Sequence, residues 1–120
     1  MRSILLPFLL CIATPAAAQE FLYVSSDGDE YRASENEHGG ALTSLYPKAR
    51  FIEAGAESRV VRGIETIYFG RSCDAFTEAF GQGTWNWSNG GFRVTFDNGK
   101  ILGFPRQEIP WDSLLHCESR

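Results

Sequence analysis

Carboxylates and histidines are the side chains with which this chain could do acid–base chemistry. Asp74 and Glu78 lie four residues apart, so a helix over Ser72–Phe80 would place both on one face, where one could act as acid and the other as base. Asp112 and His116 have the same spacing in the C-terminal tail. Acidic residues near the start of a helix are also favourable there without any catalytic role. The two pairs therefore support a small periplasmic hydrolase with a carboxylate-based site only as the alternative hypothesis.

The sequence contains no clear metal, cofactor or nucleophile motif. His38 lies in the polar segment Glu35–Gly40, which we interpret as a mobile loop. With Glu35 and Glu37 it could bind a metal ion, although a loop histidine with acidic neighbours is more often plain surface. The segment Asp27–Asp29 lacks the spacing and the bidentate glutamate of a calcium loop, and no serine lies in a G-x-S-x-G motif. We therefore predict no catalytic residue, no metal and no cofactor.

The tryptophans give the strongest indication of a binding site. Trp85 and Trp87 share one face of a predicted strand, and Trp111 lies in the tail outside the periodic strands. Trp and Arg dominate the energetics of interfaces, so Arg93 and Arg106 are added as charged groups at the edge of this aromatic face. Packing in the core is the competing interpretation. It is the stronger one for Trp85 and Trp87, whereas for Trp111 the two interpretations are balanced.

The N-terminal residues have the three parts of a secretory signal. Arg2 supplies positive charge, Ile4–Ala13 is a largely apolar run, and the small residues Ala16–Ala18 form an A-x-A cleavage site. A membrane-spanning helix would need roughly 20 apolar residues. We predict cleavage after Ala18, which leaves one exported domain over residues 19–120 without a membrane anchor. The alanine-rich cleavage region is typical of bacteria, so the periplasm or the medium is the predicted location.

The cysteine content agrees with export. Cys11 would be removed with the signal, so the mature chain would keep two cysteines, Cys73 and Cys117. In an oxidising compartment such a pair is expected to form a disulfide, and closing a loop of about 45 residues would stabilise the fold by about 4 kcal/mol. His116 beside Cys117 lacks further ligands at metal-site spacing. We predict a structural Cys73–Cys117 disulfide.

The clearest secondary structure lies between Gly83 and Phe104. Polar and apolar residues alternate there, and Asn-Gly turns at 89–91 and 97–99 separate three apolar stretches. Alternation with a period of two, interrupted by such turns, is typical of β-hairpins. We predict a three-stranded antiparallel meander.

Upstream of the meander, apolar runs of strand length are separated by turn residues. Strands are predicted at 21–25, 31–34, 49–54, 59–62 and 64–69, and the run 42–46 fits either a helical turn or a short strand. Ser72–Phe80 is the only helix indicated, because Cys73, Phe76 and Phe80 are spaced by three and four residues before Gly81. The fold class that follows is mainly β, or a small α+β fold. It is a compact antiparallel sheet, barrel or sandwich of about six to eight short strands with one short helix.

Composition limits the class of partner. The chain carries 11 Lys and Arg against 15 Asp and Glu, which gives a net charge of −4. Nucleic acids and anionic membranes bind basic surfaces, so we exclude nucleic acid as a partner. An aromatic face without a catalytic motif favours an exported, non-enzymatic binding or inhibitor-type interaction module. Its predicted partner is an envelope protein, a peptide or a carbohydrate.

Overall fold

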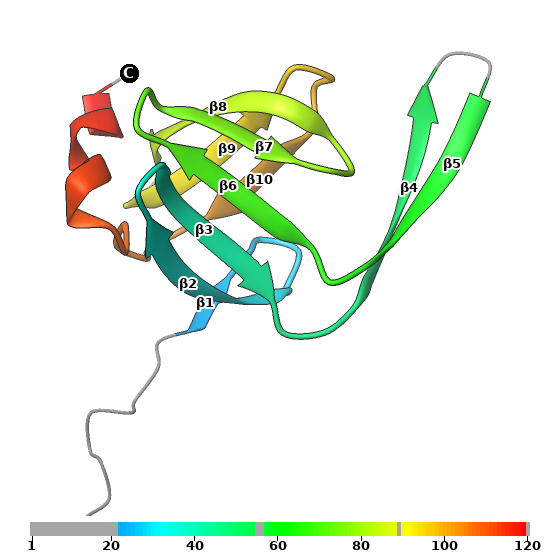
Figure 1. Cartoon of the computed structure of the whole chain (residues 1–120), viewed down its shortest axis with the longest axis horizontal. Coiled ribbons are helices and arrows are strands. Elements are labelled where there is room, and N and C mark those ends of the chain that lie inside the picture. Colours follow the sequence, from blue (N-terminus) through cyan, green and yellow to red (C-terminus); the bar gives the residue numbers. More distant parts are fainter. Residues whose placement is uncertain (1–21, 55–56, 89, 120) are drawn as a thin grey trace, which may run out of the picture.

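The fold is dominated by one antiparallel β-sheet. The computed structural model describes residues 22–54, 57–88 and 90–119 (Figure 1). The strands are β1 (Leu22–Val24), β2 (Glu30–Asn36), β3 (Gly39–Ser44), β4 (Lys48–Ala54), β5 (Glu57–Gly63), β6 (Thr66–Gly70), β7 (Asp74–Thr77), β8 (Gly81–Ser88), β9 (Gly91–Phe96) and β10 (Ile101–Phe104), followed by the 3-10 helix η2 (Asp112–Ser119). Eight strands pair in the order β1-β2-β3-β6-β7-β8-β9-β10, and β4 pairs with β5 alone. No helix within these ranges is long and apolar enough to cross a membrane.

The eight-stranded sheet curls until its two edges meet, as in an up-and-down barrel. The backbone N–H of Ser26, just after β1, donates to the Gly103 carbonyl of β10 at 2.8 Å. Gln107 then closes the seam with its side chain. Its Oε1 accepts from the Val24 N–H at 2.8 Å and its Nε2 donates to the Val24 carbonyl at 2.7 Å. The amide of Gln107 thus pairs with β1 as a further strand residue would.

Aromatic rings fill the interior of the barrel. The alternation in β9 turns Phe92, Val94 and Phe96 inward, and the ring of Phe92 stacks on that of Phe104 with centroids 4.9 Å apart. An eight-stranded barrel is just wide enough for side chains to fill it. The fully buried large side chains are Trp85, Trp111, Tyr31, Phe69, Phe92, Phe96, Phe104, Leu42, Ile67, Leu102, Leu114 and Val94. The interior is therefore a packed core.

The predicted meander is confirmed as β8, β9 and β10. Trp85 pairs with Val94 and Trp87 with Phe92 across the first hairpin, and Leu102 pairs with Val94 across the second. The stretch 42–46, which fitted a helical turn or a strand, contains the end of strand β3. Local alternation was sufficient evidence for these strands because each has one face on the core.

The predicted helix over Ser72–Phe80 is wrong. Residues Asp74–Thr77 form strand β7, which pairs with β6 on one side and β8 on the other. Ala75 and Thr77 point inward and Phe76 points outward, and of the three residues whose spacing suggested a helical face only Phe76 lies in the strand. Hydrogen bonding to two neighbouring strands outweighs the local helical pattern in so short a segment.

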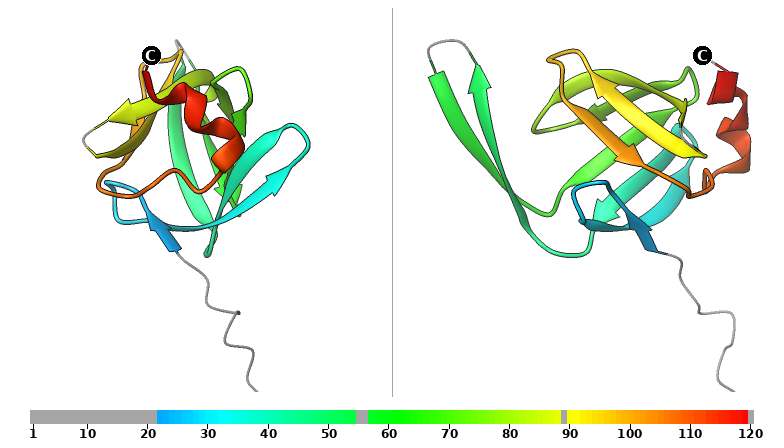
Figure 2. Two further views of the ribbon diagram at one scale, coloured as in Figure 1. Left: turned by 90° about the vertical axis from the view of Figure 1, so that its left-hand side faces the viewer. Right: turned by 180° about the vertical axis from the view of Figure 1, so that it is seen from behind.

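Helix η2 covers one end of the barrel (Figure 2), and the sequence did not indicate it. Trp111, just before η2, packs against the ring of Phe69 with centroids 4.8 Å apart and donates its indole N–H to the Ser34 carbonyl at 2.6 Å. The Cys73–Cys117 disulfide is confirmed, with Cα atoms 5.5 Å apart, and it holds η2 to the start of β7. The predicted signal lies outside the described residues.

We expect Trp111→Ala to lower the free energy of unfolding by about 3–5 kcal/mol, because it removes a fully buried indole and leaves a cavity in the capped end. Leu115→Ala on the same helix is the matched control, since Leu115 is 42% exposed and its truncation should cost less than about 1 kcal/mol. Urea denaturation of both variants measures the difference. Equal losses would show that η2 does not anchor the barrel through Trp111.

Candidate functional site

The tryptophans predicted to form a binding face lie mainly inside the barrel. Trp85 and Trp111 are each 1% exposed, and both contact the ring of Phe69. Trp87 is partly buried and packs against the same core. The indole N–H groups of Trp85 and Trp87 find no hydrogen-bond partner among the described residues. Trp85 and Trp111 therefore offer almost no surface to a partner, because Trp85 lies on the inward face of β8 and Trp111 packs on Phe69 where the tail covers the end of the barrel.

The two predicted arginines are exposed, but Trp85 and Trp111 form no exposed aromatic face beside them. Arg93 points outward from β9, where it pairs in register with Asn86 and Gly103. Arg106 follows β10 in a turn and has a positive φ of 56°. With the indoles of Trp85 and Trp111 in the core, these arginines are left as surface charges on the barrel.

Strand structure separates the acid–base pair Asp74 and Glu78, whereas Asp112 and His116 both lie in η2. Asp74 begins β7 and Glu78 follows its end, so the extended chain puts their Cα atoms roughly 13 Å apart. The predicted loop Glu35–Gly40 is a tight hairpin turn instead of a mobile loop, because β2 continues to Asn36 and β3 begins at Gly39. The acid–base geometry that a helix over residues 72–80 would have supplied is not formed.

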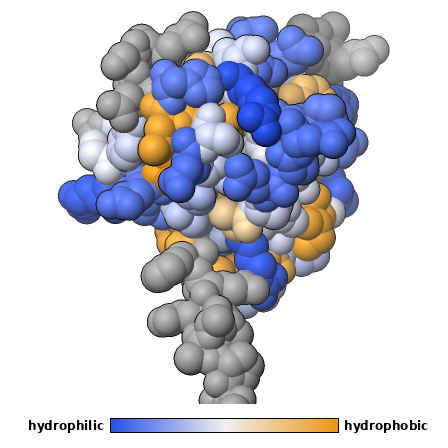
Figure 3. Space-filling view, turned by 60° about the vertical axis from the view of Figure 1, so that its left-hand side comes forward, coloured by the Kyte–Doolittle hydropathy of each residue, from blue (hydrophilic) through white to orange (hydrophobic). Residues whose placement is uncertain are grey.

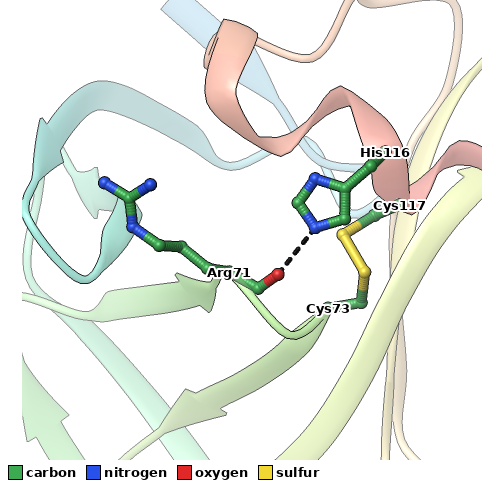
Figure 4. The surroundings of a disulfide bond; sticks show 4 residues. All are labelled: Arg71, Cys73, His116 and Cys117. Atoms are coloured by element: carbon green, nitrogen blue, oxygen red, sulfur yellow. Dashed lines mark hydrogen bonds between the residues drawn. A yellow bond between two sulfur atoms is a disulfide. The ribbon is translucent and has the colours of Figure 1, made fainter.

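His116 lies beside the disulfide and has a structural contact. Its Nε2 is 2.7 Å from the Arg71 carbonyl oxygen, which links η2 to the turn before β7 (Figure 4). Possible ligand atoms of Cys73, His116 and Cys117 all lie within 4.8 Å of one another. Because the two sulfurs are joined to each other, they are not available as thiolate ligands for a metal.

The most distinctive surface feature is an arm formed by β4 and β5. It leaves the barrel between β3 and β6 and projects beyond the barrel wall (Figures 1 and 2). Strands were predicted at 49–54 and 59–62, and both are confirmed. Their separation from the main sheet was not predicted, because period-two alternation identifies a strand without identifying its neighbours. We call residues 48–63 the arm.

The arm carries apolar side chains on both of its faces. Phe51 and Val60 pair directly across the two strands and are 65% and 40% exposed. Ile52 and Val61, the next residues along, point to the opposite face, where Ile52 is buried and Val61 is half-buried. A ribbon with one face on its own barrel would be expected to alternate apolar and polar residues. The outer pair Phe51–Val60 departs from that pattern.

A buried ion pair joins the base of the arm to the barrel. Arg50 donates from Nε to Oε1 of Glu65 at 2.8 Å and from Nη2 to Oε2 at 2.9 Å. The Tyr31 hydroxyl, inside the barrel, donates to the same Oε2 at 2.7 Å. The Ser44 hydroxyl accepts from the Glu65 N–H at 2.9 Å. Glu65 is 8% exposed, so the arm and barrel are connected through a nearly buried carboxylate with both oxygens bonded.

These contacts alter the ionisation of the three groups. Burial alone would raise the pKa of Glu65, but the hydrogen bonds from Arg50 and Tyr31 outweigh it and hold that pKa below its usual value. Burial, followed by the hydrogen bond to Glu65, raises the pKa of Tyr31 well above its usual range. The hydrogen bond to Glu65 raises the pKa of Arg50 despite burial. The carboxylate and guanidinium therefore remain charged around neutral pH.

Further charges surround this ion pair. Lys48 pairs with Asp29, and the Arg50 guanidinium lies within 3.9 Å of the Asp27 and Asp29 carboxylates. The same guanidinium lies over the ring of Phe80, 5.1 Å from its centroid. Both Lys48 and Arg50 are thus engaged by the barrel, which ties the base of the arm to it.

A cleft of about 420 Å³ lies between the arm and the barrel. On the barrel side, Tyr68 of β6 and Phe76 of β7 are cross-strand neighbours and are 49% and 43% exposed. On the arm side the cleft is lined by Lys48, Arg50, Val61, Arg62 and Gly63. By contrast, the face that includes the helix-capped end is mostly hydrophilic (Figure 3). The arm and this cleft form the candidate binding site.

The sequence contained a weak signal for this site. Phe51-Ile52 and Val60-Val61 are consecutive apolar pairs in strands that otherwise carry charges, which indicates a ribbon with two apolar faces. Tyr68 and Phe76 could not be identified as site residues from the sequence, because they become neighbours only through the pairing of β6 with β7.

Comparison with protein-family models, curated proteins and solved structures finds no match for this chain. The geometry of the candidate site is therefore what indicates its function.

We expect Glu65 to make the free energy of unfolding decrease more steeply as the pH is lowered. Its pKa is lower in the folded protein than the ordinary value of 4.5, so its contribution is present above that pH and is lost as the pH falls through the folded pKa. Glu65→Gln should cost about 3 kcal/mol at neutral pH, because it leaves the partly buried Arg50 without its closest partner.

Free energies of unfolding measured between pH 7 and pH 2 test this expectation. The variant should show a shallower acid dependence than the parent, whereas Glu78→Gln, which changes an exposed carboxylate, should retain the parent slope. Parallel curves for the parent and Glu65→Gln would contradict the assigned ion pair.

Proposed function

We propose that this chain is an exported, non-enzymatic binding domain whose arm and adjoining cleft engage a protein partner. The observation that carries the proposal is the outer apolar pair, Phe51 and Val60, on an arm with apolar side chains on both faces. An isolated two-stranded ribbon is marginally stable in water. Contact with a partner would bury the outer pair and would add stability to the arm.

The location of the apolar side chains supports a macromolecular partner. The pair Phe51–Val60 lies on the outside of the arm, while Tyr68 and Phe76 lie in the cleft on its other side. A partner that contacted both surfaces would enclose the arm. Neither β4 nor β5 has a second strand neighbour in the described ranges, so their outer edges also offer backbone hydrogen-bond groups to an added strand.

Export is part of the proposal and is supported by two features. The Cys73–Cys117 disulfide is compatible with an oxidising compartment, and the N-terminal residues have the pattern of a secretory signal. Of the two acid–base pairs behind the alternative hydrolase hypothesis, Asp74 and Glu78 no longer share a helical face, because the residues between them form strand β7.

We expect Phe51→Ser/Val60→Ser to reduce capture of a partner from envelope extract. Once that partner is purified, the variant should bind it with a dissociation constant raised by about tenfold or more. Because both side chains are exposed, the circular dichroism and melting temperature of the variant should stay close to those of the parent. Leu22→Ser/Ile101→Ser is the matched control, since it removes two apolar side chains of 42% and 49% exposure from the barrel. Unchanged affinity in the folded arm variant, or an equal loss in the control, would contradict the proposal.

A further inference from the structure

The barrel side of the cleft presents an aromatic surface. Tyr68 and Phe76 are paired across β6 and β7 on the outward face of the barrel, and each is nearly half exposed. Ile64, at the junction of arm and barrel, is 54% exposed and lines the same cleft. Contiguous exposed apolar side chains within a concave surface are typical of interaction sites. This part of the cleft is suited to an apolar or aromatic side chain of a ligand.

The arm side of the cleft adds a cation that the chain itself does not neutralise. Arg62 lines the cleft and is exposed. Within the described part of the chain it has no hydrogen-bond or ion-pair partner, in contrast to Lys48 and Arg50, which are held by Asp29 and Glu65. A guanidinium binds a carboxylate through two parallel N–H donors. Arg62 therefore favours an acidic group in the ligand.

The charge distribution of the whole chain favours the same ligand. The arm holds four of the 11 Lys and Arg and two of the 15 Asp and Glu, which gives it +2 and leaves −6 for the rest of the chain. Lys48 and Arg50 are already paired with Asp29 and Glu65 of the barrel, so in the cleft Arg62 is the group that attracts an acidic side chain of a partner. The acidic barrel disfavours a ligand that carries negative charge along its whole length. Glu78, an exposed carboxylate of the cleft lining on the barrel side, reinforces that preference.

The size and edges of the cleft select an extended segment. A volume of about 420 Å³ is near the lower end of ligand pockets, enough for a few side chains and too small for a folded domain. Extended peptides alternate their side chains between two directions, and the edges of the arm provide the N–H and C=O groups that such a segment can pair with.

From these observations we infer that the cleft binds an extended segment of the partner protein that combines an aromatic or apolar residue with an acidic one. The apolar side chain packs on Tyr68 and Phe76, and the carboxylate pairs with Arg62. This inference rests on the proposed function, because it assigns the chemistry of the partner that engages the arm. It identifies Arg62 as the residue that discriminates acidic from basic segments.

Two blocked synthetic pentapeptides test the inference, one alternating Phe with Glu and the other alternating Phe with Lys. Each is titrated into the isotope-labelled, disulfide-intact chain lacking the predicted signal, and amide shifts are followed by NMR. We expect the Glu peptide to shift residues around Arg62, Tyr68 and Phe76, and the Lys peptide to bind at least about tenfold more weakly. Arg62→Gln should weaken binding of the Glu peptide by a similar factor. Arg93→Gln, the control that changes another exposed arginine, should leave that affinity unchanged.

Four results would overturn the inference. Equal binding of the two peptides, or an unchanged affinity in Arg62→Gln, would show that Arg62 does not select a carboxylate. No shift at the cleft with either peptide would show that the cleft does not take such a segment. Concentration-dependent dimerisation in sedimentation, abolished by Phe51→Ser/Val60→Ser, would show that a second copy of the chain is the occupant.

Failure of the inference is distinguishable from failure of the proposed function. If capture of a partner depends on Phe51 and Val60 but the Glu peptide does not bind the cleft, the binding domain stands and the assigned segment chemistry is wrong. If capture is also insensitive to Phe51 and Val60, both are wrong.

Discussion

The carboxylate of Glu65 is the point on which the arrangement of arm and barrel depends. Removing a charged group from water is costly, and here Arg50 from the arm and Tyr31 from the barrel offset that cost with hydrogen bonds of 2.7–2.9 Å. This ion pair joins the base of the arm to the barrel where the arm leaves the sheet between β3 and β6. Arg50 and Glu65 both line the cleft, so the ion pair is also part of the candidate site.

The opposite end of the barrel is stabilised by different interactions. There the Cys73–Cys117 disulfide and the indole of Trp111 hold η2 over the open end of the sheet. Gly40 makes this packing possible, because a Cβ at that position would lie 2.1 Å from the Trp111 ring. With one end capped and the interior filled by aromatic rings, the surfaces available to a partner lie outside the barrel. A rigid barrel that presents a weakly supported arm suits a binding role.

Local sequence patterns predicted the strands more successfully than they predicted the site. The meander from Gly83 to Phe104 and the disulfide could be identified, because alternation, Asn-Gly turns and cysteine number are local or countable signals. The interval Ser72–Phe80 was misleading, since three apolar residues happened to have helical spacing although only Phe76 lies in the four-residue strand β7, which pairs on both sides with β6 and β8. The burial of Trp85 and the exposure of Tyr68 and Phe76 are set by which face of the sheet closes inward, and the burial of Trp111 is set by how the tail packs over the end of the barrel. That information is tertiary, and no local pattern contains it.

The central claim is that the arm and its cleft form the surface that meets the partner. Hydrogen exchange of the chain with and without a captured partner tests it most directly, because the backbone amides of β4 and β5 have free edges and few supporting contacts. The account predicts that the partner slows exchange in residues 48–63 and in the strands carrying Tyr68 and Phe76, and leaves β9 and β10 unchanged. Protection confined to β9, β10 or η2, with the arm exchanging as before, would contradict it.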